Sequence, residues 1–137
     1  MRRYVLDANA LLVHFANRPG ANRVGALFEE ALRQQATLSM SAVNWGEAFY
    51  SLWKQGGEAT ARRLARETET LPLVILAADR DRATRAAELK ATQGLGYADS
   101  FAAALALELA ATLVTSDPEF TKIGKRLKVL ALPRHKH

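Results

Sequence analysis

Short apolar runs alternate along the chain with longer segments in which apolar residues recur every three or four positions. The short runs predict five buried strands, at residues 4–6, 37–40, 73–76, 113–115 and 129–132. The longer segments predict helices at residues 8–16, 24–32, 58–69, 79–92 and 97–111, and a further helix whose apolar stripe covers 45–53. Strands and helices therefore alternate over almost the whole chain.

This alternation predicts an α/β fold. Strands separated by helices of ten or more residues form βαβ crossovers, which give a parallel sheet with helices on both faces. We expect a single domain over residues 1–137 with three α/β/α layers, a mainly parallel sheet of about five strands and a short basic C-terminal tail from about residue 133. The carboxyl ends of such strands lie on one edge of the sheet, where ligand sites collect.

The composition narrows the class of protein. Hydrophobic residues make up 49% of the 137 residues, enough to build a core without a disulfide or a structural metal. The absence of cysteine excludes thiol chemistry and cysteine-bound zinc. A net charge of +5 favours a polyanionic partner only weakly, because solvated arginine-rich helix faces explain it equally well. We predict neither a signal peptide nor a transmembrane segment, and therefore expect a cytoplasmic protein with no membrane partner.

Four acidic residues lie where predicted strands end and helices begin. Asp7 directly follows the first strand, and Asp117 follows the fourth strand within two residues. Glu47 lies in the first part of the helix after the second strand, and Asp99 lies at the start of the alanine-rich helix. We therefore expect all four carboxylates on the same edge of the sheet.

Helix capping is a competing explanation for each acid taken singly. Asp is a favoured N-cap because its carboxylate accepts the free backbone N–H groups of the first helical turn. Asp117 followed by Pro118 fits this pattern, as do Asp7 and Asp99. The spacing of Asn44 and Glu47 resembles a variant of the capping box.

Taken together, the four acids favour a metal site. Carboxylates that converge repel one another unless a cation neutralises them. Mg²⁺ and Mn²⁺ prefer oxygen ligands, and the three histidines are badly placed for zinc, since His14 is alone in a helix and the other two are in the tail. Three short polar side chains are candidates for orienting the carboxylates or for satisfying turn backbone groups: Asn9, Thr115 and Ser116.

Four segments resemble the motifs of PIN-domain ribonucleases. They are residues 5–12 (VLDANALL), 41–47 (SAVNWGE), 96–104 (GYADSFAAA) and 113–120 (LVTSDPEF), and the resemblance runs from Tyr4 to about Leu132. It implies that Asp7, Glu47, Asp99 and Asp117 are the catalytic, metal-binding carboxylates, with Asn9 and Thr115 in support. The compact length is similar to that of VapC toxins, which implies a homodimer and a VapB-type antitoxin whose tail blocks the acidic pocket.

The resemblance implies Mg²⁺- or Mn²⁺-dependent cleavage of RNA, and a type II toxin–antitoxin role. A cation lowers the pKa of a bound water and stabilises charge on the phosphoryl oxygens. Because an acidic pocket repels a polyanion, basic side chains near it are needed to hold flanking phosphates. The candidates for RNA binding are Arg2, Arg3, Arg18, Arg23, Lys122 and Lys125.

Two other functions remain open. An Asp-based phosphotransferase uses a nucleophilic Asp after the first strand, but enzymes of that kind need a second Asp two residues later, and that position is Asn9. A non-catalytic RNA- or protein-binding α/β module would use the four acids only as helix caps. It would have no metal-dependent cleavage to lose.

Overall fold

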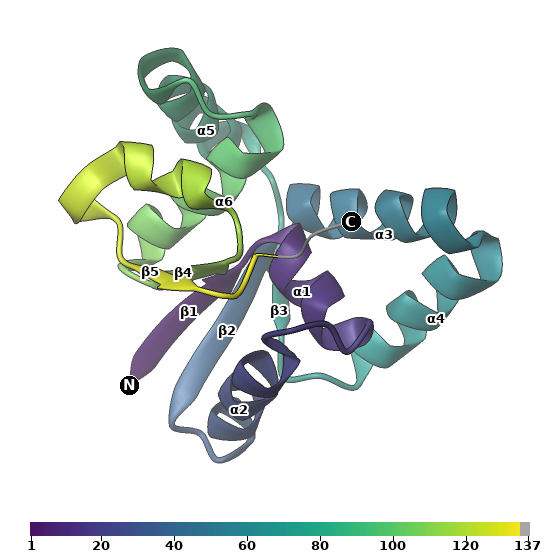
Figure 1. The fold of residues 1–137 in the computed structure, drawn as a ribbon. Coiled ribbons are helices and arrows are strands. Elements are labelled where there is room, and N and C mark those ends of the chain that lie inside the picture. The colour runs from purple at the N-terminus through teal and green to yellow at the C-terminus, as the bar shows by residue number, and fades with distance from the viewer. Residues whose placement is uncertain (135–137) are drawn as a thin grey trace.

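A five-stranded sheet forms the centre of the protein in the computed structural model, which describes residues 1–134 (Figure 1). Its strands are β1 (Arg2–Leu6), β2 (Ala36–Ser41), β3 (Val74–Leu76), β4 (Thr112–Thr115) and β5 (Val129–Ala131). They lie in the order β3-β2-β1-β4-β5, and every neighbouring pair is parallel. The predicted α/β class is confirmed. The last three residues of the predicted basic tail, including His135 and His137, lie outside the described residues.

Six α-helices and a 3₁₀ segment connect the strands. They are α1 (Ala8–Phe15), α2 (Ala21–Leu32), α3 (Ala42–Gly56), α4 (Glu58–Glu69), α5 (Arg80–Gln93), α6 (Tyr97–Leu109) and η1 (Pro118–Arg126). The helix predicted to reach residue 111 ends at Leu109, because Ala110 takes a left-handed conformation with φ of 52°. The segment η1 was predicted only through its start, where Asp117 precedes Pro118. Within residues 1–134, no helix combines the length and the hydrophobicity that a membrane span requires.

The helices cover both faces of the sheet, as the three-layer prediction requires (Figure 1). Successive side chains of a strand point to opposite faces. Tyr4 and Leu6 therefore join the core beneath α1, α2, α3 and α4, while Val5 joins the core beneath α5, α6 and η1. Each face has its own buried cluster, and the polar carboxyl edge lies between them.

The strand order changes direction at β1. From β1 the chain adds β2 and β3 on one side of the sheet, and later adds β4 and β5 on the other side. Ligand crevices of open parallel sheets form at such a switch point, outside the carboxyl ends of the strands. The register pairs Leu6 with Val114, so the segments that follow β1 and β4 begin side by side although they are far apart in sequence.

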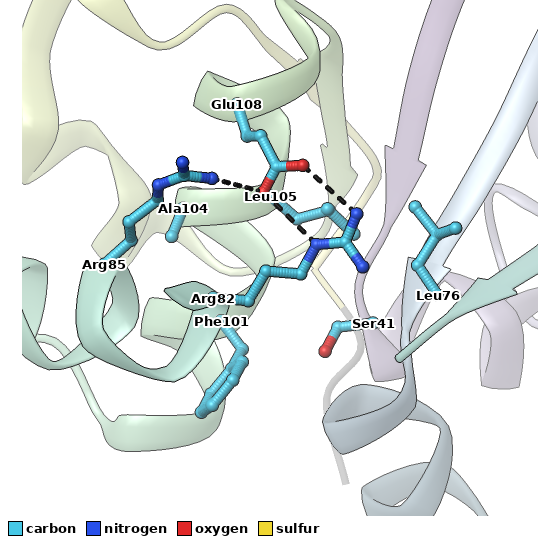
Figure 2. Close-up of a pocket in the computed structure, with 8 residues that line it drawn as sticks. All are labelled: Ser41, Leu76, Arg82, Arg85, Phe101, Ala104, Leu105 and Glu108. Atoms are coloured by element: carbon cyan, nitrogen blue, oxygen red, sulfur yellow. Dashed lines mark hydrogen bonds and ion pairs between the residues drawn. The ribbon is translucent and has the colours of Figure 1, made fainter. Parts of the chain in front are cut away.

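An ion-pair cluster ties α5 to the end of α6 (Figure 2). Arg82 donates from Nε and Nη2 to the two oxygens of Glu108, at 3.2 Å each, and Arg85 donates to Glu108 Oε1 at 2.9 Å. The remaining Nη1 of Arg82 donates to the carbonyl of Ala77, which follows β3. The side chains of Arg82 and Glu108 are only 25% and 21% exposed, so solvent screens this pair less than a surface pair. The cluster therefore fixes α6, the helix that carries Asp99.

We expect Glu108→Ala to lower the free energy of unfolding by about 1–3 kcal/mol, because two guanidinium groups lose a shared carboxylate in a partly buried position. Chemical denaturation measures this loss. The matched control is Glu29→Ala, which breaks an exposed i,i+4 pair with Arg33, and its expected cost is below about 1 kcal/mol. Equal losses in the two variants would mean that the cluster adds nothing to an ordinary surface ion pair.

Candidate functional site

A polar cavity of about 400 Å³ lies at the carboxyl edge of the sheet. All four predicted acids line it: Asp7, Glu47, Asp99 and Asp117. The rest of its lining is Ala8, Asn9, Leu12, Arg18, Ser51 and Gln55. Four segments separated in sequence therefore bring their acidic side chains to one place, as expected from the direction of the strands.

Asp7 is held most tightly of the four. It is only 5% exposed, and it caps α1 by accepting a hydrogen bond from the backbone N–H of Ala10 at 2.8 Å. The hydroxyl of Thr115 donates to its second carboxylate oxygen. The backbone N–H of Asp117 in turn donates to Thr115 Oγ1 at 3.0 Å, so one hydroxyl connects the two loops that follow β1 and β4.

Burial changes the protonation of Asp7. Burial first, and then repulsion from Asp99 and Glu47, raise the pKa of this carboxyl from 3.8 to about 7. The hydrogen bonds from Thr115 and Ala10 favour the charged form and oppose the increase. Near neutral pH the side chain is therefore divided between its acid and carboxylate forms.

Asp99 and Glu47 come to the cavity from two further helices, α6 and α3. Burial, together with the nearby charges of Asp117, Glu47 and Glu119, raises the pKa of Asp99 to about 6. Burial also raises the pKa of Glu47, while the amide of Asn44 lowers it. Three acids with raised pKa values in one cavity indicate carboxyl groups that have lost water on folding and whose charge is poorly compensated there.

The capping explanation holds for two of the four acids. Asp7 caps α1, and Asp117 caps η1 by accepting from the N–H of Glu119 at 2.9 Å. Asp99 is not a cap, because Gly96 occupies that position of α6. The suggested capping box at Asn44 and Glu47 is wrong, because the hydroxyl of Ser41 caps α3 through the N–H of Val43. Capping alone therefore does not account for the set.

Asn44 is a site residue that sequence reasoning missed. It is fully buried, and its Nδ2 donates to the carbonyl of Ala98 at 2.9 Å, next to Asp99. This hydrogen bond joins the first turn of α3 to the first turn of α6, and so sets the positions of Glu47 and Asp99 relative to each other. The available signal was a polar residue three positions before Glu47, on the same helical face.

The predicted supporting residues differ in their placement. Asn9 lines the cavity, and its Oδ1 is buried without a hydrogen-bond partner in the described part of the chain. Thr115 binds Asp7 directly. Ser116 is buried, but it lies outside the lining of the cavity.

The predicted basic residues are scattered, and only Arg18 lines the cavity. Arg2 and Arg3 lie at the amino end of β1, about 13–17 Å along the strand from Asp7. There Arg2 pairs with Glu30 at 3.3 Å and Arg3 donates to the carbonyl of Leu109 at 2.8 Å.

The remaining basic candidates are exposed outside the cavity lining: Arg23 in α2, and Lys122 and Lys125 in η1. Lys122 is paired with Glu119 at 2.6 Å. Arg18 is thus the basic candidate that the structure brings closest to the acids.

The acids surround a cavity rather than forming a closed cage. Among residues 1–134, no group of three Asp, Glu or His side chains stands close enough together to hold one metal ion as it is. Like charges repel, so a cation among these carboxylates would offset their mutual repulsion. The donor set consists of oxygens alone, which suits Mg²⁺ or Mn²⁺ rather than zinc.

Known structures share this fold. The chain is similar to one in VapBC2 of Rickettsia felis bound to promoter DNA, with 21% identity, a TM-score of 0.74, and 95% of this chain and 98% of that chain covered. It is also similar to one in VapBC-1 of nontypeable Haemophilus influenzae, with 26% identity, a TM-score of 0.66, and coverages of 94% and 97%.

A third similar structure is VapC20 of Mycobacterium tuberculosis, described as a toxin that cleaves the sarcin–ricin loop. The identity is 13%, the TM-score 0.70, and the coverages are 88% of this chain and 95% of that chain. No curated protein sequence matches the chain. The sequence profile of the PIN domain matches residues 4–126. This match includes all four acidic segments that carry the predicted resemblance. The chain belongs to the PIN domain family.

Proposed function

We propose that this protein is an endoribonuclease that hydrolyses RNA phosphodiester bonds with the help of Mg²⁺ or Mn²⁺. The observation that carries the proposal is the meeting of four carboxylates in one polar cavity, with raised pKa values at Asp7, Asp99 and Glu47. Membership of the PIN domain family supports nuclease activity. The site residues are Asp7, Glu47, Asp99 and Asp117.

The residues present fit a hard divalent cation. Every acidic group at the cavity offers oxygen, and Asn9 adds an oxygen that is buried and unpartnered within residues 1–134. Asp7, Asp99 and Glu47 are the proposed inner ligands, and Asp117 acts through water or completes a second ion site. When bound, the cation lowers the pKa of a water and offsets negative charge on the phosphate.

The chain's own residues orient these groups. Thr115 and the N–H of Ala10 hold the two oxygens of Asp7, so its carboxylate keeps one direction. Asn44 ties α3 to α6 and thereby positions Glu47 beside Asp99. Arg18 supplies the positive charge at the cavity that an RNA phosphate requires.

We infer that the cellular role is that of a toxin controlled by a VapB-type antitoxin. The similar chains come from VapBC complexes, and each is covered almost end to end. A basic side chain of the antitoxin placed among the unneutralised carboxylates would replace the cation and inhibit the enzyme. A homodimer is part of the same proposal and rests on the resemblance alone, and the cytoplasmic location is the expectation drawn from the sequence.

The two competing functions have less support. Phosphotransfer by Asp7 needs a second carboxylate two residues later, and the structure places the amide of Asn9 at the cavity instead. A pure binding module explains Asp7 and Asp117 as caps, but it gives no reason for Asp99 and Glu47 to share their cavity.

We expect purified protein to cut total cellular RNA into discrete fragments with Mg²⁺ or Mn²⁺ and not with EDTA. Asp7→Asn and Asp99→Asn should each lower the cleavage rate at least about 100-fold, because each removes a charged oxygen ligand. Gel electrophoresis with fragment mapping measures this. The control is Asp79→Asn, which changes the exposed cap of α5 outside the cavity and should cleave like the unchanged protein.

Full metal-dependent cleavage by either site variant would remove that residue from the site. No cleavage of any RNA by the unchanged protein, together with no rise in its melting temperature on adding metal, would favour the binding module. A covalent aspartyl-phosphate on Asp7 would favour the phosphotransferase.

Without metal, we expect Asp7→Asn to stabilise the protein more at pH 8 than at pH 4.5. A carboxyl whose pKa rises from 3.8 to about 7 on folding favours the folded state below pH 3.8, and this advantage is lost as the pH rises through 7. Asn carries no charge and still accepts from Ala10, so the gain grows by as much as a few kcal/mol over this interval. Denaturation in EDTA at both pH values measures the gain, and a pH-independent difference would contradict a raised pKa.

A further inference from the structure

The cavity continues beyond the acids along α3. Its lining includes Glu47, Ser51 and Gln55, which follow one another at intervals of four residues and so share one face of the helix. From Glu47 to Gln55 the helix rises by about 12 Å. Leu12 from α1 and Arg18 from the loop after it also line the cavity. In Figure 1 these segments lie next to each other, and α1 contacts α3.

The two parts of this groove differ in charge. The part next to the sheet is lined by carboxylates, whereas Ser51 and Gln55 are polar and neutral, and Arg18 brings the positive charge of the lining. Gln55 Nε2 donates to Ser51 Oγ at 3.2 Å, which fixes the orientation of the amide. With one N–H engaged, the amide of Gln55 still has a second N–H and a carbonyl oxygen for a ligand.

We propose that this outer part of the groove, defined by Arg18, Ser51 and Gln55, binds the nucleotide next to the scissile phosphate and reads its base. A side-chain amide that presents a donor beside an acceptor is suited to pair with a base edge. The guanidinium of Arg18 is suited to form charge-assisted hydrogen bonds with a flanking phosphate. The serine hydroxyl is suited to a ribose hydroxyl, which both donates and accepts.

The size of the cavity leaves room for such a ligand. The acidic part and the outer part together have a volume of about 400 Å³, within the range of pockets that take small organic ligands, about 300–1,000 Å³. Single-stranded RNA is read through bases that are turned out of the stack, and such a base needs a polar edge and an apolar surface. The amide of Gln55 offers the polar edge, and the side chain of Leu12 offers the apolar surface. The inference rests on the proposed function for the identity of the ligand.

The test separates recognition from cleavage. A labelled pool of random-sequence, single-stranded RNA oligonucleotides is bound to Asp99→Asn protein, and the bound fraction is sequenced. The same measurement is made on two double variants, in which Asp99→Asn is combined with Gln55→Ala or with the control Gln35→Ala. Gln35 is an exposed residue before β2 that does not line the cavity. Circular dichroism establishes that all variants fold.

We expect Gln55→Ala to weaken RNA binding about three- to tenfold and to abolish base preference at one position of the selected sequences. Gln35→Ala should leave both unchanged. Arg18→Gln should weaken binding to all sequences equally and reduce its dependence on salt.

Unchanged affinity and base preference with Gln55→Ala would overturn the proposal, and so would a failure of Asp99→Asn protein to bind any RNA. Effects of Gln55→Ala only on binding of a protein partner would assign the groove to that partner. Gln55-dependent RNA binding in a protein that never cleaves RNA would keep the groove and reject the nuclease function. The two proposals therefore fail by different results.

Discussion

The parallel pairing of β1 with β4 brings a buried carboxylate against a buried hydroxyl, and the site is built around this contact. Asp7 follows β1 and Thr115 ends β4, so the register that pairs Leu6 with Val114 places them side by side. The hydroxyl donates to Asp7 while accepting from the backbone of Asp117. One interaction therefore joins two loops, orients one carboxylate and places a second one close to it.

The loss of water around the carboxyl groups explains the raised pKa values in the cavity. A carboxylate that is 5% exposed has lost most of its water, and two hydrogen bonds only partly replace it. Asp99 and Glu47 then add repulsion, because Asn44 holds their helices together. Such a cavity takes up protons near neutral pH and is suited to a divalent cation. The carboxylates are thus left without full compensation of their charge at the proposed binding site for a substrate with phosphate groups.

In the proposed function, the two parts of the cavity have different tasks. The carboxylates next to the sheet extend from strand ends and from the first two turns of helices that hydrogen bonds of Thr115 and Asn44 tie together. Ser51 and Gln55 lie farther along α3, where a side chain can change without disturbing the Asp7–Thr115 contact. In the proposed function, a substitution there would alter the nucleotide that is recognised and leave the acids in place.

Much of this protein was determined by its sequence. The alternation of apolar runs and helical stripes is local, so it predicted the strands, the helices and the parallel sheet. The direction of each strand then placed Asp7, Glu47, Asp99 and Asp117 on one edge. The same direction puts Arg2 and Arg3 at the amino end of β1, the end opposite to Asp7. Only the tertiary structure decided the partners of Asn44, the pKa of Asp7 and the place of Gln55 in the cavity. These depend on how helices pack and how far water is excluded, and such distances between remote segments leave no local pattern in a sequence.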